Sequence, residues 1–101
     1  MLTVKSVRHA YPERAGFSIK RELGYESHTF LHFFDSVELL VDGRIIKTEP
    51  HACIVYPARV PQYFMSSAPL THDWIHFDGP IESVSRHGIL PERVYYPESA
   101  D

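Results

Sequence analysis

Two histidines and the only tryptophan alternate within residues 71–77 of this 101-residue chain. Side chains on a β-strand point to opposite faces in turn, so His72, Trp74 and His76 would share one face of such a strand. An indole offers a broad apolar plate with one N–H donor, and neutral imidazoles offer donors and acceptors without a fixed charge. This group is suited to binding a small polyhydroxylated or aromatic ligand. A tryptophan-centred core with hydrogen-bonded imidazoles would produce the same spacing, and the spacing alone favours neither interpretation.

The seven histidines of the chain raise the question of a metal site. His28 and His32 are four residues apart, as are His72 and His76. On a helix this spacing would direct both side chains to one ion, but along a strand it separates the Cα atoms by about 13 Å. A metal would therefore need one histidine from each of several strands. We expect no intrinsic metal and no cofactor, and we retain a site built from several strands as the alternative.

Nucleophilic catalysis is not expected from this sequence. Ser27, Ser36, Ser66 and Ser67 lack the strand, turn and helix context of a Gly-x-Ser-x-Gly nucleophile. Cys53 is the only cysteine and lies in an apolar run, so it is predicted to be a small core residue of a protein from a reducing compartment. The five glycines form no phosphate-binding cradle. We predict no catalytic residues.

The elements that must position the histidine and tryptophan side chains are predicted to be strands. Between residues 17 and 78, short apolar segments alternate with turn residues, and none keeps a 3.6-residue period for three turns. Several segments carry apolar residues on both faces, so both faces must be partly covered, as in a sandwich or a barrel. We expect a mostly β domain with strands near residues 17–21, 28–34, 36–41, 44–48, 52–56, 62–66 and 71–78.

Local signals predict the remaining elements. Asp42-Gly43 between two apolar segments predicts a hairpin with a type I′ turn, because both central residues of that turn need a positive φ. Residues 80–87 begin with proline and are followed by glycine, which predicts one short helix. Residues 1–14 are expected to form an N-terminal arm. Residues 90–97 are expected to be extended, with exposed apolar and aromatic side chains.

Length and composition describe one folded domain spanning residues 1–101, which excludes a multidomain enzyme. Ten Lys and Arg against thirteen Asp and Glu leave a formal charge of -3, and the basic residues are scattered, so direct nucleic-acid binding by this chain is not expected. The sequence lacks an apolar stretch of roughly 20 residues and an apolar signal segment at its start. We expect a cytoplasmic protein that does not bind membranes.

Two segments carry a family resemblance: EPHACIVYPARVPQYF (residues 49–64) and THDWIHFDG (residues 71–79). In this order and spacing they resemble the N-terminal cupin-like domain of AraC-type bacterial transcription regulators. In that family a proline-bounded strand and turn precede a polar-aromatic pair, and a strand with Trp and Phe three residues apart follows. The strand near 17–21, the Asp42-Gly43 turn and the helix near 80–87 also fall where the family has a leading strand, a glycine turn and a closing helix. The resemblance covers roughly residues 15–90.

The resemblance implies an all-β fold, a double-stranded β-helix (a cupin-like jelly-roll barrel) with one short C-terminal helix. It also implies that the barrel interior binds a small effector, often a sugar. By position, Arg21 matches an arginine that hydrogen-bonds sugar hydroxyls, His72 a ligand-contacting histidine, and Trp74 the tryptophan on which the sugar ring stacks. Phe64 takes the place of a pocket tyrosine and lacks its hydroxyl, and His76 is expected beside Phe64 as secondary lining.

The sequence departs from the enzymatic cupins at their usual metal ligands. Those enzymes show His-x-His followed by Glu and a later histidine, whereas Arg59 and Gln62 stand here where Gly and His are expected. The alternative function is nevertheless a small metal-dependent cupin enzyme, an isomerase or a dioxygenase, with ligands drawn from His28, His32, His72 and His76. A third interpretation is an interaction module whose barrel is filled by its own side chains.

In the family the DNA-binding part is a pair of helix-turn-helix units that follow the sensing domain. The sequence stops at Asp101 before such units, so we expect either an excised sensing domain or a truncated member, with DNA binding belonging only to a full-length regulator. The resemblance is also compatible with a homodimer. An effector would then act by favouring one arrangement of residues 1–14 over another.

Overall fold

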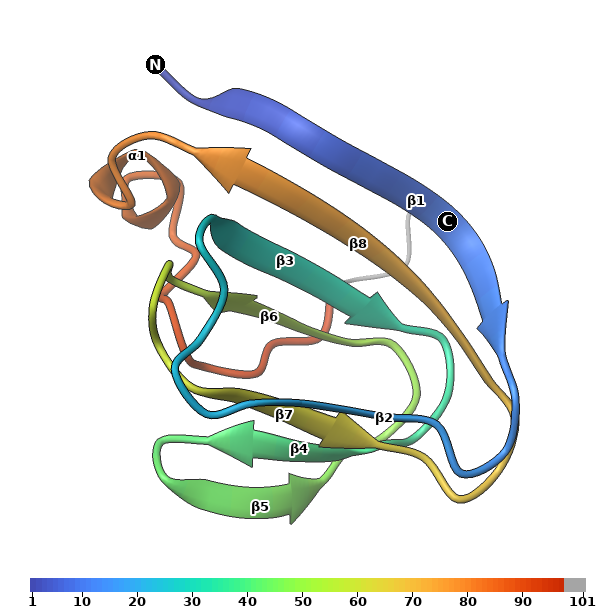
Figure 1. Ribbon diagram of the computed structural model, residues 1–101. Helices are drawn as coiled ribbons and strands as arrows, with labels where there is room; N and C mark the ends of the chain where they lie inside the picture. Colours follow the sequence, from blue (N-terminus) through green and yellow to red (C-terminus); the bar gives the residue numbers. More distant parts are fainter. Residues whose placement is uncertain (98–101) are drawn as a thin grey trace.

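Eight strands form two antiparallel four-stranded sheets in the computed structural model, which describes residues 1–97 (Figure 1). The last four residues of the predicted domain lie outside the described part. One sheet has the order β1-β8-β3-β6 and the other β2-β7-β4-β5. The elements are β1 (Thr3–Glu13), β2 (Ser18–Arg21), β3 (His28–Phe33), β4 (Glu38–Val41), β5 (Arg44–Lys47), β6 (Ala52–Tyr56), β7 (Gln62–Met65), β8 (Leu70–Asp78) and α1 (Glu82–Ser85).

The prediction of a mostly β protein is confirmed, and each of the seven predicted strands matches one observed strand whose ends differ from the prediction by at most two residues. The largest difference is at β4, which begins at Glu38 instead of residue 36. Val37 and Thr48 there exchange hydrogen bonds across the base of the hairpin. The backbone therefore leaves the regular ladder at this point although it stays paired.

The hairpin of β4 and β5 has the predicted turn. Val41 pairs with Arg44, and the two residues between them, Asp42 and Gly43, have φ of 51° and 77°. Positive φ at both central positions is the requirement of a type I′ turn, whose twist matches that of the flanking strands. The prediction from the Asp-Gly pair is confirmed.

The predicted N-terminal arm is wrong for most of its length, because β1 occupies Thr3–Glu13 and pairs antiparallel along β8 (Figure 1). Two register shifts, between Val4 and Ser6 and between Arg8 and Tyr11, interrupt the period of two in its sequence. As an edge strand, β1 is also largely exposed, so it lacks the apolar pattern that marks a buried strand.

The main core lies between the two sheets. Along β3 the inner residues are buried and the outer ones half-buried, which is the alternation expected of a strand with one face in the core. Phe33, Leu39 and Ile54 are fully buried there, and Phe64 closes the core from β7.

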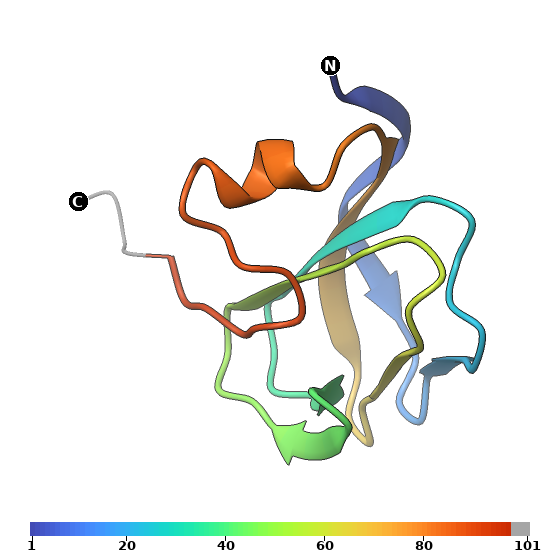
Figure 2. The ribbon, with the colours of Figure 1, turned by 90° about the vertical axis from the view of Figure 1, so that its left-hand side faces the viewer.

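A second, smaller apolar cluster lies on the outer face of the sheet that contains β6 and β8. Val55 and Phe77 pack there against Val84 of α1. Figure 2 shows α1 and the segment after it beside this sheet. The one predicted helix is present but shorter than residues 80–87, with turn-like backbone hydrogen bonds on either side of it. Within residues 1–97, no helix has the length and apolar character needed to span a membrane.

The segment after α1 is less exposed than expected. Leu90 and Tyr96 are exposed as predicted, but Tyr95 exchanges two backbone hydrogen bonds with Cys53 at 2.8 and 3.0 Å. This bridge covers part of the free edge of β6, which would otherwise be open to pairing with another chain.

Candidate functional site

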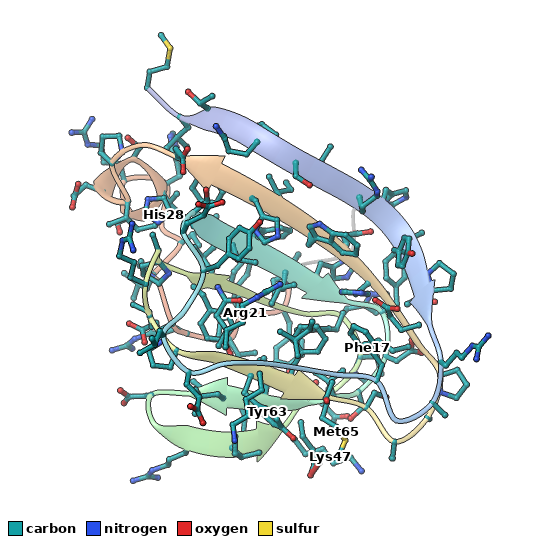
Figure 3. The ribbon with its side chains drawn as sticks, in the orientation of Figure 1. Phe17, Arg21, His28, Lys47, Tyr63 and Met65 are labelled. Carbon is teal, nitrogen blue, oxygen red and sulfur yellow. The ribbon has the colours of Figure 1, made fainter. Side chains whose placement is uncertain are left out.

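A cavity of about 290 Å³ lies between the two sheets. Figure 3 shows Phe17 and Arg21, two residues of its wall, between the sheet of β3 and the strand β2. The wall comes from one sheet through β1, β3 and β8 and from the other through β2 and β7. Its residues are Tyr11, Glu13, Phe17, Ile19, Arg21, Thr29, Leu31, Phe64, His72, Trp74 and His76.

All five residues predicted to contact a ligand lie on this wall: Arg21, Phe64, His72, Trp74 and His76. The predicted alternation along β8 is confirmed, since His72 and His76 are buried and Trp74 is half-buried on the cavity side. A void of this size beside Trp74 favours a ligand site over a packed tryptophan core. The tryptophan is held by its neighbours, with Tyr11 edge-on at 5.2 Å and His72 at 5.0 Å between ring centroids.

The sequence reasoning missed the wall residues on β1 and β3. Thr29 and Leu31 follow from the alternation along β3, which already places them on the inner face. Tyr11 and Glu13 had no such signal, because the bulges in β1 hide which of its residues face inward.

His72 has one satisfied and one unsatisfied ring nitrogen. Its side chain is 4% exposed, and Nε2 lies 3.1 Å from Glu13 Oε2. When Nε2–H donates to this carboxylate, the neutral ring presents Nδ1 as an acceptor. Among the residues that the structure describes, Nδ1 is buried without a hydrogen-bond partner. A buried polar atom without a partner is costly, so this nitrogen points to a ligand that donates a hydrogen bond.

His76 is part of a chain of hydrogen bonds at the other end of the cavity. Arg21 Nη1 donates to Gln62 Oε1 at 3.0 Å, and Gln62 Nε2 donates to Thr29 Oγ1 at 3.0 Å. The buried Thr29 hydroxyl lies 3.1 Å from His76 Nδ1, and the tautomer of the imidazole decides which of the two groups donates. Burial, and then the charge of Arg21, lower the pKa of His76. A lowered pKa favours the uncharged imidazole at neutral pH.

The loop between β2 and β3 places an aromatic ring against His76 and Arg21. Tyr25 stacks on His76 with 4.2 Å between centroids and an interplanar angle of 25°. The guanidinium of Arg21 lies 4.8 Å from the centroid of the same ring, a cation–π contact. Tyr25 thus limits the freedom of both polar side chains.

A β-bulge brings β1 onto the cavity wall. Arg8 pairs with Trp74 and Tyr11 with His72, so the interval on β1 is three residues against two on β8. The extra residue changes which side chains face inward, and Tyr11 and then Glu13 reach the cavity. The position of both residues therefore depends on this bulge.

Asp73, on the outer face of β8, stabilises the bulge. Its Oδ1 accepts a 2.7 Å hydrogen bond from the amide of Ala10, whose φ of 50° is left-handed. The same carboxylate lies 2.8 Å from a ring nitrogen of His9 and 2.8 Å from one of His32. Burial by itself raises the pKa of Asp73, but the hydrogen bonds from His32 and the Ala10 amide, with the two nearby histidines, lower it overall.

The substitution Asp73→Ala is expected to destabilise the protein by about 1.5–3 kcal/mol at pH 7, because charge-assisted hydrogen bonds to the bulge and to His32 are lost. Asp78→Ala is the control: its carboxylate forms an exposed ion pair with Lys5 on the same strand pair and should cost about 0–1 kcal/mol. Urea unfolding measures both. Because the folded-state pKa of Asp73 is lowered, its contribution is complete above about pH 3.9 and declines as the pH falls further. A cost as small as that of Asp78→Ala would show that Asp73 does not hold the bulge.

The four histidines considered as metal ligands are not brought together. His72 and His76 face the cavity, whereas His32 bonds to Asp73 on the opposite face of the sheet. Both nitrogens of His28 are engaged, with the Ala58 amide at 2.9 Å and the Gly79 carbonyl at 2.7 Å. Across residues 1–97, no three His, Cys, Asp or Glu side chains are arranged to hold a metal ion. The four histidines named from the sequence therefore do not form one ligand set within residues 1–97.

Cys53 is a core residue, as predicted. It is 2% exposed, and burial raises the pKa of its thiol to about 11. A thiol with that pKa is protonated at neutral pH and is a poor nucleophile.

No protein-family model matches this chain, and a search of curated proteins finds no match. The functional argument therefore rests on the cavity and on the residues that line it.

Proposed function

We propose that this chain is the ligand-sensing domain of an AraC-type transcription regulator, and that it binds a small carbohydrate effector between its two sheets. The observation that carries the proposal is the cavity wall on β8, where Trp74 lies beside the void and the buried Nδ1 of His72 has no partner within residues 1–97. An indole packs on the C–H face of a sugar ring, and a hydroxyl of the sugar donates to the imidazole.

We propose further that the two sheets form a double-stranded β-helix barrel. Jelly rolls consist of eight antiparallel strands in two facing sheets, and the orders β1-β8-β3-β6 and β2-β7-β4-β5 are compatible with that architecture. The resemblance of residues 15–90 to the AraC-type sensing domain supports the same assignment.

The effector would act through β1. Tyr11 and Glu13 lie on β1 and on the cavity wall, so a ligand that contacts them stabilises the arrangement in which β1 is paired with β8. The shift in population is limited by the difference in affinity between the two arrangements. In a full-length regulator this change would be passed to the DNA-binding part, and the acidic chain itself would not contact nucleic acid. We place the protein in the cytoplasm and consider a homodimer compatible with this role.

A panel of mono- and disaccharides tests the proposal by thermal unfolding and by fluorescence. At ten times its Kd, a ligand that binds only the folded state stabilises it by about 1.4 kcal/mol, which raises the Tm of a domain of this size by about 6–11 °C. Trp74 is the only tryptophan, so its emission reports binding directly. The substitution Trp74→Ala is expected to abolish the ligand-induced rise in Tm, and Trp74→Phe to retain part of it.

The matched control is Tyr63→Ala, which removes an aromatic side chain from β7 on the side away from the cavity (Figure 3). It should leave the ligand-induced rise unchanged. A carbohydrate that stabilises Trp74→Ala as much as the wild type would refute the assignment of the cavity as its site, and the absence of any response across the panel would refute the carbohydrate effector.

A further inference from the structure

The polar groups of the cavity are separated into a basic end and an acidic end. Arg21 and His76 lie at one end, where burial, and then the charge of Arg21, lower the pKa of His76. Glu13 and His72 lie at the other end, joined by a 3.1 Å contact. His72 and His76 are four residues apart on β8, about 13 Å along the strand, and Trp74 lies midway between them.

The charge of Arg21 has no carboxylate partner among residues 1–97. Its hydrogen bond goes to the neutral amide oxygen of Gln62, and its other contact is the ring of Tyr25. The neighbouring carboxylate of Glu22 instead pairs with Lys20 at 3.4 Å. A guanidinium has five N–H donors, so most of those on Arg21 remain available to a ligand.

A partly buried guanidinium on an apolar wall is best matched by an anion. Carboxylates pair with arginine through two parallel hydrogen bonds, which are stronger than bonds to neutral hydroxyls. The opposite end of the cavity favours donors, because the Glu13 carboxylate accepts and, when His72 is neutral and donates from Nε2 to Glu13, its unpartnered Nδ1 accepts as well. The volume of about 290 Å³ lies at the lower limit for small-molecule sites, which fits one sugar ring better than several.

We propose, as a refinement that rests on the sensing function above, that the effector is a hexuronate, a monosaccharide bearing a carboxylate. The carboxylate binds Arg21, the ring packs on Trp74, and hydroxyls at the far side of the ring donate to His72 and Glu13. This assignment depends on two groups at opposite ends of one cavity: the Arg21 guanidinium, which has no carboxylate partner within residues 1–97, and the unpartnered Nδ1 of His72.

Isothermal titration of the full chain with D-galacturonate and D-glucuronate, against D-galactose and D-glucose at matched ionic strength, tests the refinement. At least one uronate is expected to bind the wild type roughly 10- to 100-fold more tightly than its neutral counterpart, the range that charge-assisted hydrogen bonds provide. In Arg21→Gln this advantage should disappear, because the uronate loses charge-assisted hydrogen bonds whereas the neutral sugar loses only weaker bonds to its hydroxyls.

Two further variants test whether the preference for the uronate depends on the position and on the planar geometry of the Arg21 charge. Lys20→Gln removes the exposed neighbouring cation and should leave the preference for the uronate intact. Arg21→Lys keeps the charge without the planar fork and should retain only part of the preference. The wild-type comparison needs no variant, so a folding defect in Arg21→Gln does not prevent the test.

Equal affinity of the wild type for uronates and neutral sugars, or equal loss of both in Arg21→Gln, would overturn the uronate assignment and leave the sensing function standing. If the wild type binds none of the four sugars and responds to no other carbohydrate, the sensing function fails with it.

Discussion

The substitution Gly24→Ala is expected to destabilise the protein by about 2–5 kcal/mol, which combines the cost of a left-handed alanine with that of overpacking. Gly24 has a φ of 75°, and a Cβ at this position would lie 2.5 Å from both the backbone N and O of Val60. Backbone atoms cannot move aside as a flexible side chain does. The loop that contains Gly24 would have to move away from residues 59–60. The Arg59 amide donates a 2.8 Å hydrogen bond to the carbonyl of Tyr25 in this loop, and that bond would be strained or lost.

The matched control is Gly16→Ala. Gly16 has a similar φ of 83°, but a Cβ there meets nothing within 4 Å in the described part of the chain, so only the cost of the backbone conformation of about 1–2 kcal/mol remains. Urea unfolding of both variants isolates the steric contribution. The Gly24→Ala protein that remains folded should also bind ligand less tightly, because Tyr25 follows Gly24 and stacks on the wall residue His76. Equal destabilisation by the two substitutions would contradict the close approach of the loops.

The substitution Phe33→Ala is expected to cost about 3–5 kcal/mol, a large part of the 5–15 kcal/mol that holds a typical domain together. Phe33 is 0% exposed and lies next to the cavity. Its ring is edge-on to Phe64 at 4.9 Å and parallel to His72 at 6.2 Å. Removing it leaves a void behind two wall residues, so ligand affinity should fall together with stability.

Phe34→Ala provides a comparison at the adjacent position. Phe34 is half-buried, and its ring contacts His32 and His51 at 4.7 and 5.8 Å between centroids, outside the main core. Truncating this side chain should cost clearly less, because less apolar area returns to water. Chemical unfolding measures both variants. A loss in Phe34→Ala as large as that in Phe33→Ala would show that the core does not lie on the face of β3 that carries Phe33.

The part of the site on β8 was predictable from the sequence, because this strand keeps an uninterrupted period of two. His72, Trp74 and His76 were placed together because a strand has a period of two, and β8 keeps that period across all three. Arg21 and Phe64 entered through the family resemblance, and the structure places both on the same wall.

The polar contacts of the site could not be predicted in this way. The chain of hydrogen bonds from Arg21 through Gln62 and Thr29 to His76 joins four strands, two from each sheet. Spacing along the chain carries no information about such cross-sheet distances. The same holds for the pairing of Glu13 with His72, which depends on the register of β1 against β8.

The sequence by itself determined the seven strands after β1, the Asp42-Gly43 turn and the shared face of β8, because alternation and turn chemistry are local properties of the backbone. Only the tertiary structure decided that residues 3–13 form an edge strand and complete the cavity wall. Two bulges interrupt the alternation there, and one of them is held by Asp73, a residue more than sixty positions away along the chain. A conformation stabilised by a distant side chain leaves no periodic pattern in its own segment.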